Sequence, residues 1–217
     1  MISYPLKKIK FIYQFNTGFT PDTSDGDSYS KDNNGYVWVT IADMNQKYVS
    51  DSNQKLTNKG IRGRKNNLVK KGSLLYSFKL SVGKVAFAGQ DLYTNEAIAS
   101  FYSDTYDLNF LYYAAPIYIE KSANVNIYGA KLLNQDLIKN AKIPFPPVEI
   151  QKKIVSKLDK LCKAIDEQIE IITNEVNELK NYRQSLINEI TLKGLNKDVK
   201  MKKTFDWLVM YLSIGLL

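Results

Sequence analysis

A heptad pattern of apolar residues in the last third of the chain is the feature that most constrains its fold. Between residues 155 and 190, apolar side chains recur at alternating steps of three and four, and only Arg183 interrupts the series. A 3.5-residue period held over about five heptads is typical of a coiled-coil seam. The apolar members are Val155, Leu158, Cys162, Ile165, Ile169, Ile172, Val176, Leu179, Leu186 and Ile190. One helix cannot bury such a stripe alone, so the sequence predicts a partner helix.

Both ends of this helix carry stop or capping residues. The segment Phe145-Pro146-Pro147 blocks helix before it, and Pro147 suits a first helical turn. Glu149 complements the helix dipole at the start, and Lys193-Gly194 supplies a cation and a C-cap glycine at the end. We expect a helix of about 70 Å over residues 147–193, at ~1.5 Å per residue. The apolar stripe widens at both ends, which predicts that each end also packs against something globular.

The preceding residues predict one α+β domain with a mixed or mostly antiparallel sheet. Alternating or continuous apolar runs indicate strands and a short helix, at 36–41, 74–78, 82–87 and 97–101 for strands and 104–118 for the helix. Near the start of the chain, Ile9, Phe11, Ile12 and Phe15 are expected in the core. We expect three parts: a domain over residues 1–146, the coiled-coil helix over 147–193, and a tail over 194–217.

The composition argues against catalysis by this chain. It contains no histidine and one cysteine, which removes the Ser-His-Asp triad, the Cys-His pair and histidine-ligated zinc. No glycine-rich fingerprint or Walker motif is present, so we expect neither a nucleotide cofactor nor a metal. The lone Cys162 allows no disulfide within one chain, which fits a reducing cytoplasm.

Positive charge is concentrated in the predicted domain. The chain has a net charge of +8, and residues 52–90 contain nine Lys or Arg with no acidic residue between Asp51 and Asp91. A block of one sign this long makes a field suited to a polyanion, although it could equally be an ordinary solvated surface.

Aromatic and polar residues lie among these cations, as on many nucleic-acid-binding faces. The segment 59–65 (KGIRGRK) is the sharpest candidate, because its glycines allow close backbone approach and its arginines can form paired hydrogen bonds to phosphate or guanine. The phosphate-contact candidates are Arg62, Arg64, Lys65, Lys79 and Lys84. The candidates for contacts near base edges are Tyr36, Trp38, Thr40 and Asn95.

The entry to the long helix reads IPFPPVEIQKKIV at residues 143–155, and LKNYRQSLI follows at 179–187. With these segments the chain resembles the DNA-specificity subunit of type I restriction-modification systems. Shorter upstream matches are LKKI at 6–9, GFTP at 18–21, TNKGI at 57–61, GSLL at 72–75 and TNEAI at 94–98.

The resemblance implies a non-catalytic, cytoplasmic DNA-recognition subunit with no membrane segment. Such subunits carry two target-recognition domains, each followed by a helix, and the two helices pack as an antiparallel coiled coil. This chain has one domain and one helix, so we expect a homodimer that reads an inverted repeat of double-stranded DNA. The implied partners are a methyltransferase subunit, which uses S-adenosylmethionine, and a motor-nuclease subunit, which uses ATP; neither cofactor is expected on this chain.

The end of the chain departs from the family pattern. Residues 200–202 resemble the lead into a second recognition domain, but residues 203–217 do not continue it. We expect this tail to be the trace of a truncated two-domain protein rather than a membrane anchor, because it is shorter than the ~20 apolar residues that span a bilayer.

Two other functional classes stay open from the residues alone. A coiled-coil adaptor with a basic, protein-binding head would bind its partner without the strong salt dependence of DNA binding. A nuclease would need a metal-binding string, and the nearest Glu-x-Lys, Glu178-Leu179-Lys180, lies on the predicted seam helix.

Overall fold

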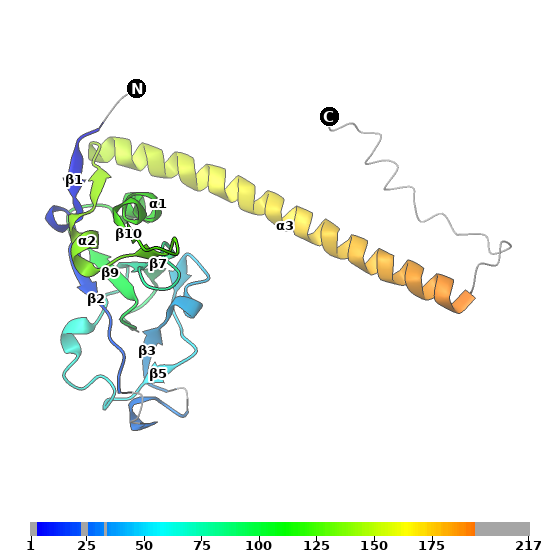
Figure 1. Ribbon diagram of the computed structural model, residues 1–217, viewed down its shortest axis with the longest axis horizontal. Coiled ribbons are helices and arrows are strands. Elements are labelled where there is room, and N and C mark those ends of the chain that lie inside the picture. Colours follow the sequence, from blue (N-terminus) through cyan, green and yellow to red (C-terminus); the bar gives the residue numbers. More distant parts are fainter. Residues whose placement is uncertain (1–3, 23–25, 33, 194–217) are drawn as a thin grey trace. The chain divides into compact units, whose positions relative to one another are not determined.

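The computed structural model describes residues 4–22, 26–32 and 34–193 (Figure 1). The predicted tail and the expected C-cap Gly194 lie outside the described residues. The helices are α1 (Leu108–Tyr118), α2 (Gln135–Asn140) and α3 (Val148–Lys193). The strands are β1 (Leu6–Lys8), β2 (Gln14–Thr17), β3 (Tyr36–Val39), β4 (Tyr48–Val49), β5 (Lys55–Leu56), β6 (Leu74–Ser77), β7 (Val85–Ala88), β8 (Tyr93–Thr94), β9 (Ile98–Tyr102), β10 (Asn124–Val125), β11 (Lys131–Leu132) and β12 (Lys142–Pro144).

The strands form mixed sheets, which confirms the α+β prediction. The main sheet has the order β2-β9-β6-β7-β4, and its pairs are antiparallel except for the parallel pair β4–β7. A smaller sheet has the order β5-β3-β8, with β3 and β8 parallel. The antiparallel pairs β1–β12 and β10–β11 complete the strands of the described residues.

The main sheet is covered on both faces. On one face Leu74 and Tyr76 pack in the same cluster as side chains of α1. On the other face Leu75 packs with Val37 and Val39 of the smaller sheet. A strand buried on both faces needs apolar residues at successive positions, which is why residues 74–76 are all apolar.

The predicted core near the start of the chain is partly wrong. Ile9 and Ile12 are buried and Phe15 is half-buried, but Phe11 is 74% exposed. Residues 9–11 form a 3-10 turn, in which residues three apart share a face. Ile9 and Ile12 therefore point inward together, and Phe11 points to solvent.

Polar caps set the ends of two predicted elements. The strand expected over 36–41 ends at Val39, because Thr40 begins a 3-10 turn. Thr40 and Asp43 form a capping box, in which the Asp43 carboxylate accepts hydrogen bonds from the Thr40 backbone N–H and hydroxyl. The helix expected over 104–118 begins only at Leu108, where the Asp107 carboxylate accepts a backbone N–H of the first turn at 2.8 Å.

The first turns of α3 belong to the packing of the domain. The contacts of the chain divide it into two units, residues 1–159 and 160–217, so the division falls inside α3. Gln151 is buried and its side-chain amide donates to the Pro146 carbonyl at 2.8 Å. Val155 is 9% exposed and packs against Phe110 and Ala114 of α1. Val155, expected in the partner interface, is instead covered by its own chain.

The rest of the apolar stripe on α3 is not covered by the described residues. Leu158 and Leu186 are half-buried, whereas Cys162 and the other members from residue 165 onward are exposed. The exposed fractions are 57% for Ile165, 55% for Ile169 and Ile172, 42% for Val176, 48% for Leu179 and 54% for Ile190.

A polar contact fixes α3 to the domain at Asp159. Its carboxylate accepts a hydrogen bond from the Tyr113 hydroxyl at 2.6 Å and one from Lys47 Nζ at 3.0 Å. The Lys47 ammonium also lies 5.2 Å from the ring centroid of Tyr112. The hydrogen bond from Tyr113, followed by that from Lys47, lowers the pKa of Asp159.

Asp159→Asn should lower the free energy of unfolding by about 1 kcal/mol or less at pH 7, because both charged groups are partly exposed and screened. The folded pKa of Asp159 is depressed, so its contribution is present above the unfolded pKa of about 4 and is lost as the pH falls. Urea denaturation should separate the two proteins at pH 7 and bring them together at a second pH value, below the depressed pKa of folded Asp159. Asp166→Asn, further along α3, is the control and should match the wild type at both values; a gap for Asp159→Asn that persists at low pH would contradict the assignment.

Candidate functional site

The nine cations of residues 52–90 stand on the surface, and some are neutralised by carboxylates. Three form ion pairs: Lys55 with Asp51 at 3.1 Å, Lys59 with Asp27 at 3.4 Å, and Lys70 with Asp91 at 3.1 Å. The remaining six form no ion pair within the described part of the chain; they are Arg62, Arg64, Lys65, Lys71, Lys79 and Lys84. Five of these six are the residues predicted from the sequence as phosphate contacts.

Arg62, Arg64 and Lys65 lie close together in one turn region, next to Ile61, whose side chain is buried. Ile61 is 8% exposed and packs with Trp38 and other side chains of the smaller sheet. The three cations on the same turn are exposed. Because Ile61 is buried in the core, the neighbouring cations are held on the surface close to one another.

Two glycines allow this turn to form. A Cβ on Gly60 would lie 2.3 Å from the Ser28 carbonyl oxygen, so only glycine fits there. Gly63 has a φ of +73°, a conformation that glycine adopts without steric cost.

The Arg64 guanidinium lies 5.2 Å from the ring centroid of Phe19. Next to Phe19, the Thr20 hydroxyl donates a hydrogen bond to Glu96. That hydrogen bond, and to a lesser degree the charge of Lys79, lowers the pKa of Glu96. Arg64 therefore contacts Phe19, and Lys79 is near enough to Glu96, the partner of Thr20, for its charge to act on that carboxylate.

Lys84 contacts the turn that Thr40 begins. Lys84 Nζ donates to the Ile41 carbonyl and to Asn45 Oδ1, both at 3.3 Å. Thr40 is half-buried, and its hydroxyl and backbone N–H both donate to Asp43. Thr40 shapes the turn beneath Lys84, with its hydroxyl occupied.

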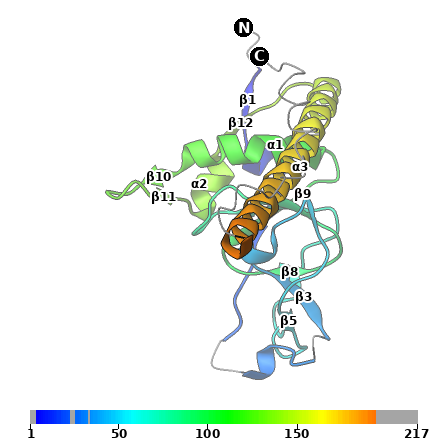
Figure 2. The same ribbon diagram turned by 90° about the vertical axis from the view of Figure 1, so that its right-hand side faces the viewer.

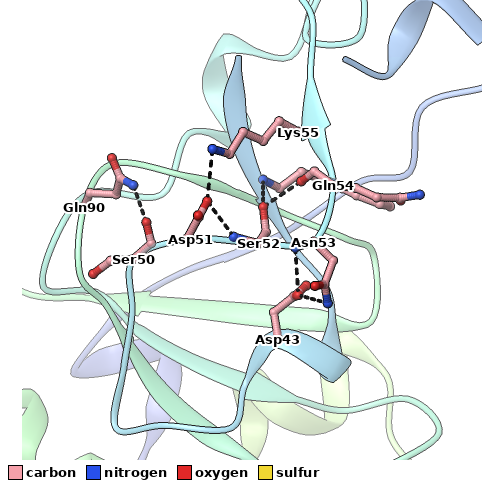
Figure 3. A network of polar contacts seen from close by, with 9 residues as sticks. Asp43, Ser50, Asp51, Ser52, Asn53, Gln54, Lys55 and Gln90 are labelled. Carbon is pink, nitrogen blue, oxygen red and sulfur yellow. Dashed lines mark hydrogen bonds and ion pairs between the residues drawn. The ribbon is translucent and has the colours of Figure 1, made fainter. Parts of the chain in front are cut away.

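A polar hollow of about 370 Å³, missed by the sequence reasoning, opens beside this turn and is lined by residues of the segment 42–53. Figure 3 shows the polar contacts of Asp43, Ser52 and Asn53 in this segment. Asp43 Oδ1 accepts from the backbone and side-chain amides of Asn53, at 3.0 and 2.8 Å. The Ser52 hydroxyl donates to the Gln54 carbonyl at 2.6 Å. Asn45 and Asn53 are exposed in this hollow. Amide side chains of this kind can hydrogen-bond base edges.

A polar run, ADMNQKYVSDSN at 42–53, was the available sequence signal for this hollow. Polar residues between two strands are common in plain loops, so the run did not by itself indicate a concave surface.

The remaining base-edge candidates differ in exposure. Trp38 is 5% exposed and its indole N–H donates to the Phe19 carbonyl at 3.0 Å, so it packs in the core and is unsuited to a surface contact. Tyr36 is 42% exposed, and its hydroxyl donates to Asn58 Oδ1 at 3.1 Å. Asn95 is half-buried, and its side-chain oxygen accepts the Ala97 N–H at 3.2 Å.

An apolar groove of about 500 Å³ lies away from these cations, between β1, α1, β12 and the first turns of α3. Leu6, Phe110, Tyr113, Ile117 and Ile154 are among its lining residues. Such a lining offers nothing to phosphate and suits an apolar protein segment. Among the described residues, no cluster of three or more His, Cys, Asp or Glu could hold a metal ion, and no helix is long and apolar enough to cross a membrane.

Comparison with known families places residues 3–181 in one family model, described as the type I restriction modification DNA specificity domain. The chain is 27% identical over 190 residues to the MjaIX type I restriction enzyme specificity subunit of Methanocaldococcus jannaschii, a match that covers 82% of this chain and 43% of that protein. It is 30% identical over 98 residues to the EcoBI specificity subunit of Escherichia coli, over 45% of this chain and 21% of that protein.

Solved structures show the same fold. An HsdS subunit from Thermoanaerobacter tengcongensis aligns with a TM-score of 0.64 at 19% identity, over 86% of this chain and 44% of that one. A structure from a study of the assembly of the type I R-M system aligns with a TM-score of 0.70 at 18% identity, over 87% and 46%. The chain thus spans less than half the length of these relatives.

Gly18→Ala should destabilise the domain by about 1–3 kcal/mol, because the new Cβ would lie 2.1 Å from the Thr94 carbonyl oxygen and 2.2 Å from that of Asn95. Gly26→Ala is the matched control, since a Cβ there meets nothing within 4 Å. Thermal unfolding followed by circular dichroism compares the two. Equal melting temperatures would show that the 17–20 segment is not held as tightly as its contacts indicate.

Proposed function

Since this chain belongs to the type I restriction-modification DNA specificity family, we propose that it reads one half of a two-part DNA target. The observation that carries the proposal is one domain with a surface group of cations that form no ion pair with the described residues, followed by one helix whose apolar stripe is exposed. The family's subunits carry two recognition domains, and this chain matches less than half of its curated relatives.

DNA would be held by phosphate contacts and read by polar side chains. Arg62, Arg64 and Lys65 stand on one turn and Lys79 stands on another, a spread that suits contacts along a duplex backbone. The hollow over residues 42–53 supplies amide and carboxylate groups next to Lys84. Such groups distinguish base pairs in the major groove, whereas the lysines and arginines set the register.

Within a complete system the chain would act without chemistry of its own. The methyltransferase subunit would bring S-adenosylmethionine and the motor-nuclease subunit would bring ATP. Both would dock on this subunit, and the apolar groove beside α1 is a surface with the right character for one of them.

The second half of the target would be read by a second copy. Two α3 helices aligned antiparallel along the exposed stripe would cross near Val176, the middle of the exposed series from Cys162 to Ile190. Each copy would then bury the exposed side chains of the other, and the two recognition domains would face an inverted repeat.

An adaptor role remains the second candidate, and one observation favours it. The hairpin of β10 and β11 extends from the domain (Figure 2) and exposes Ile127 by 90% and Tyr128 by 87%. Exposed apolar side chains of this size suit a protein partner.

Salt dependence separates the two candidates. Duplex binding by the full chain, measured by fluorescence anisotropy, should weaken steeply with salt, with a log–log slope of about −0.9 per phosphate contact. Replacing Arg62, Arg64 and Lys65 with alanine should reduce that slope by about 3 and the affinity by at least about tenfold. A triple alanine variant of Lys153, Lys157 and Lys160 on α3 removes the same charge and should bind as the wild type. Duplex binding whose affinity does not change with salt concentration would favour the adaptor role.

Self-association tests the role of the stripe. Ile172→Asp should raise the dimer dissociation constant by about 100-fold or more, because each copy would place a carboxylate in the apolar centre of the seam. Asn174→Asp adds the same charge off the stripe and should leave the dimer intact. Sedimentation equilibrium at micromolar concentration measures both, and a monomeric wild type would refute the paired-helix arrangement.

A further inference from the structure

Leu80, in the loop between β6 and β7, combines two unusual properties. Its φ is +60°, and among the described non-glycine residues it is the one with a positive φ. A bulky side chain in this left-handed region is sterically unfavourable, whereas glycine or asparagine would fit it readily. The Leu80 side chain is also 97% exposed, so no packing among the described residues accounts for its conformation.

The loop that carries Leu80 is held firmly at its base. Ser77 is completely buried, and its hydroxyl donates to the Ser81 carbonyl and accepts the Lys84 N–H at 2.9 Å. The Gly83 N–H donates to the Ser77 carbonyl at 3.0 Å. These contacts close the loop from both sides, and Leu80 is presented at its tip.

The carboxylate of Glu120 lies near Gly83 at the base of this loop, whereas cations flank Leu80 itself. Lys79 precedes it, Lys84 closes the loop, and neither forms an ion pair within the part of the chain that is described. Through Asn45, Lys84 reaches the polar hollow of residues 42–53. A lone apolar side chain between two cations differs from the contiguous apolar patch that marks a protein interface.

We infer that Leu80 is a base-contacting residue of the DNA half-site, making an apolar contact while Lys79 and Lys84 bind the flanking phosphates. The inference rests on the proposed function and adds a specificity-determining residue to it. An exposed loop tip flanked by cations can reach base edges in the major groove, where apolar side chains contact thymine methyl groups, and leucine also serves as a wedge between base steps. Retained backbone strain at an exposed tip is a property of functional sites.

The probe is a set of 30-base-pair duplexes selected by the wild-type full chain from a random-sequence pool, together with scrambled versions of them. Leu80→Ala should weaken binding to the selected duplexes by about tenfold or more, since it removes the burial of a leucine side chain. Binding to scrambled duplexes should change by less than about twofold, and the salt slope should not change, because phosphate contacts dominate both. Lys79→Ala should show the opposite pattern, with a smaller slope and weaker binding to every duplex.

Two further variants separate the contact from effects on folding. Leu80→Gly should lose affinity for the selected duplexes as Leu80→Ala does, while its melting temperature stays equal or rises, because glycine accepts the positive φ. Ile127→Ala, at a position 90% exposed on the other hairpin, should bind both duplex sets as the wild type does.

The outcomes distinguish this inference from the proposed function. Salt-sensitive binding by the wild type that Leu80→Ala retains within about twofold would overturn the role of Leu80 and leave the proposed function standing. Unchanged DNA affinity with loss of co-purification with the methyltransferase subunit would reassign Leu80 to a protein contact. A wild type that binds no duplex in a salt-dependent way would overturn both.

Discussion

Burial of β6 on both faces is the constraint on which the rest of the domain depends. Leu74 and Tyr76 are covered by α1, and Leu75 is covered by the smaller sheet. The loops that leave this sheet are held at their bases by buried groups, such as Ser77 below Leu80 and Ile61 below the arginines. Charged side chains can therefore stand at fixed places on the surface, because the apolar residues beside them are committed to the core.

The heptad pattern of α3 packs against the domain at its start and is exposed over the rest of its length. Its first turns, with Gln151 and Val155, are part of the domain, and Asp159 adds a polar contact at the end of that region. Beyond this point the same heptad pattern continues with its apolar side chains exposed. A continuous helix that begins in the core of one domain is a suitable way to hold that domain at a set distance from a second one, which is the role proposed for it.

The candidate interface combines three kinds of side chain with different consequences for recognition. Cations without carboxylate partners give affinity that depends on salt, and the amides of the polar hollow give hydrogen bonds that depend on sequence. Leu80 would add an apolar contact, whose contribution is independent of salt. Within the chain, the ion pairs of Lys55, Lys59 and Lys70 remove those three lysines from the first group.

The sequence by itself determined the long helix, the α+β class and the place of the basic block. These depend on local period, on proline and on composition, which need no knowledge of distant contacts. Only the tertiary structure decided which side chains face solvent. Trp38 is buried because β3 joins a second sheet, Phe11 is exposed because residues 9–11 turn, and Val155 is covered because α1 lies against α3. The hollow over residues 42–53 likewise depends on contacts such as that of Lys84 with Asn45, which are far apart in sequence, and the positive φ of Leu80 is set by the backbone geometry of its loop, which residue types alone do not record.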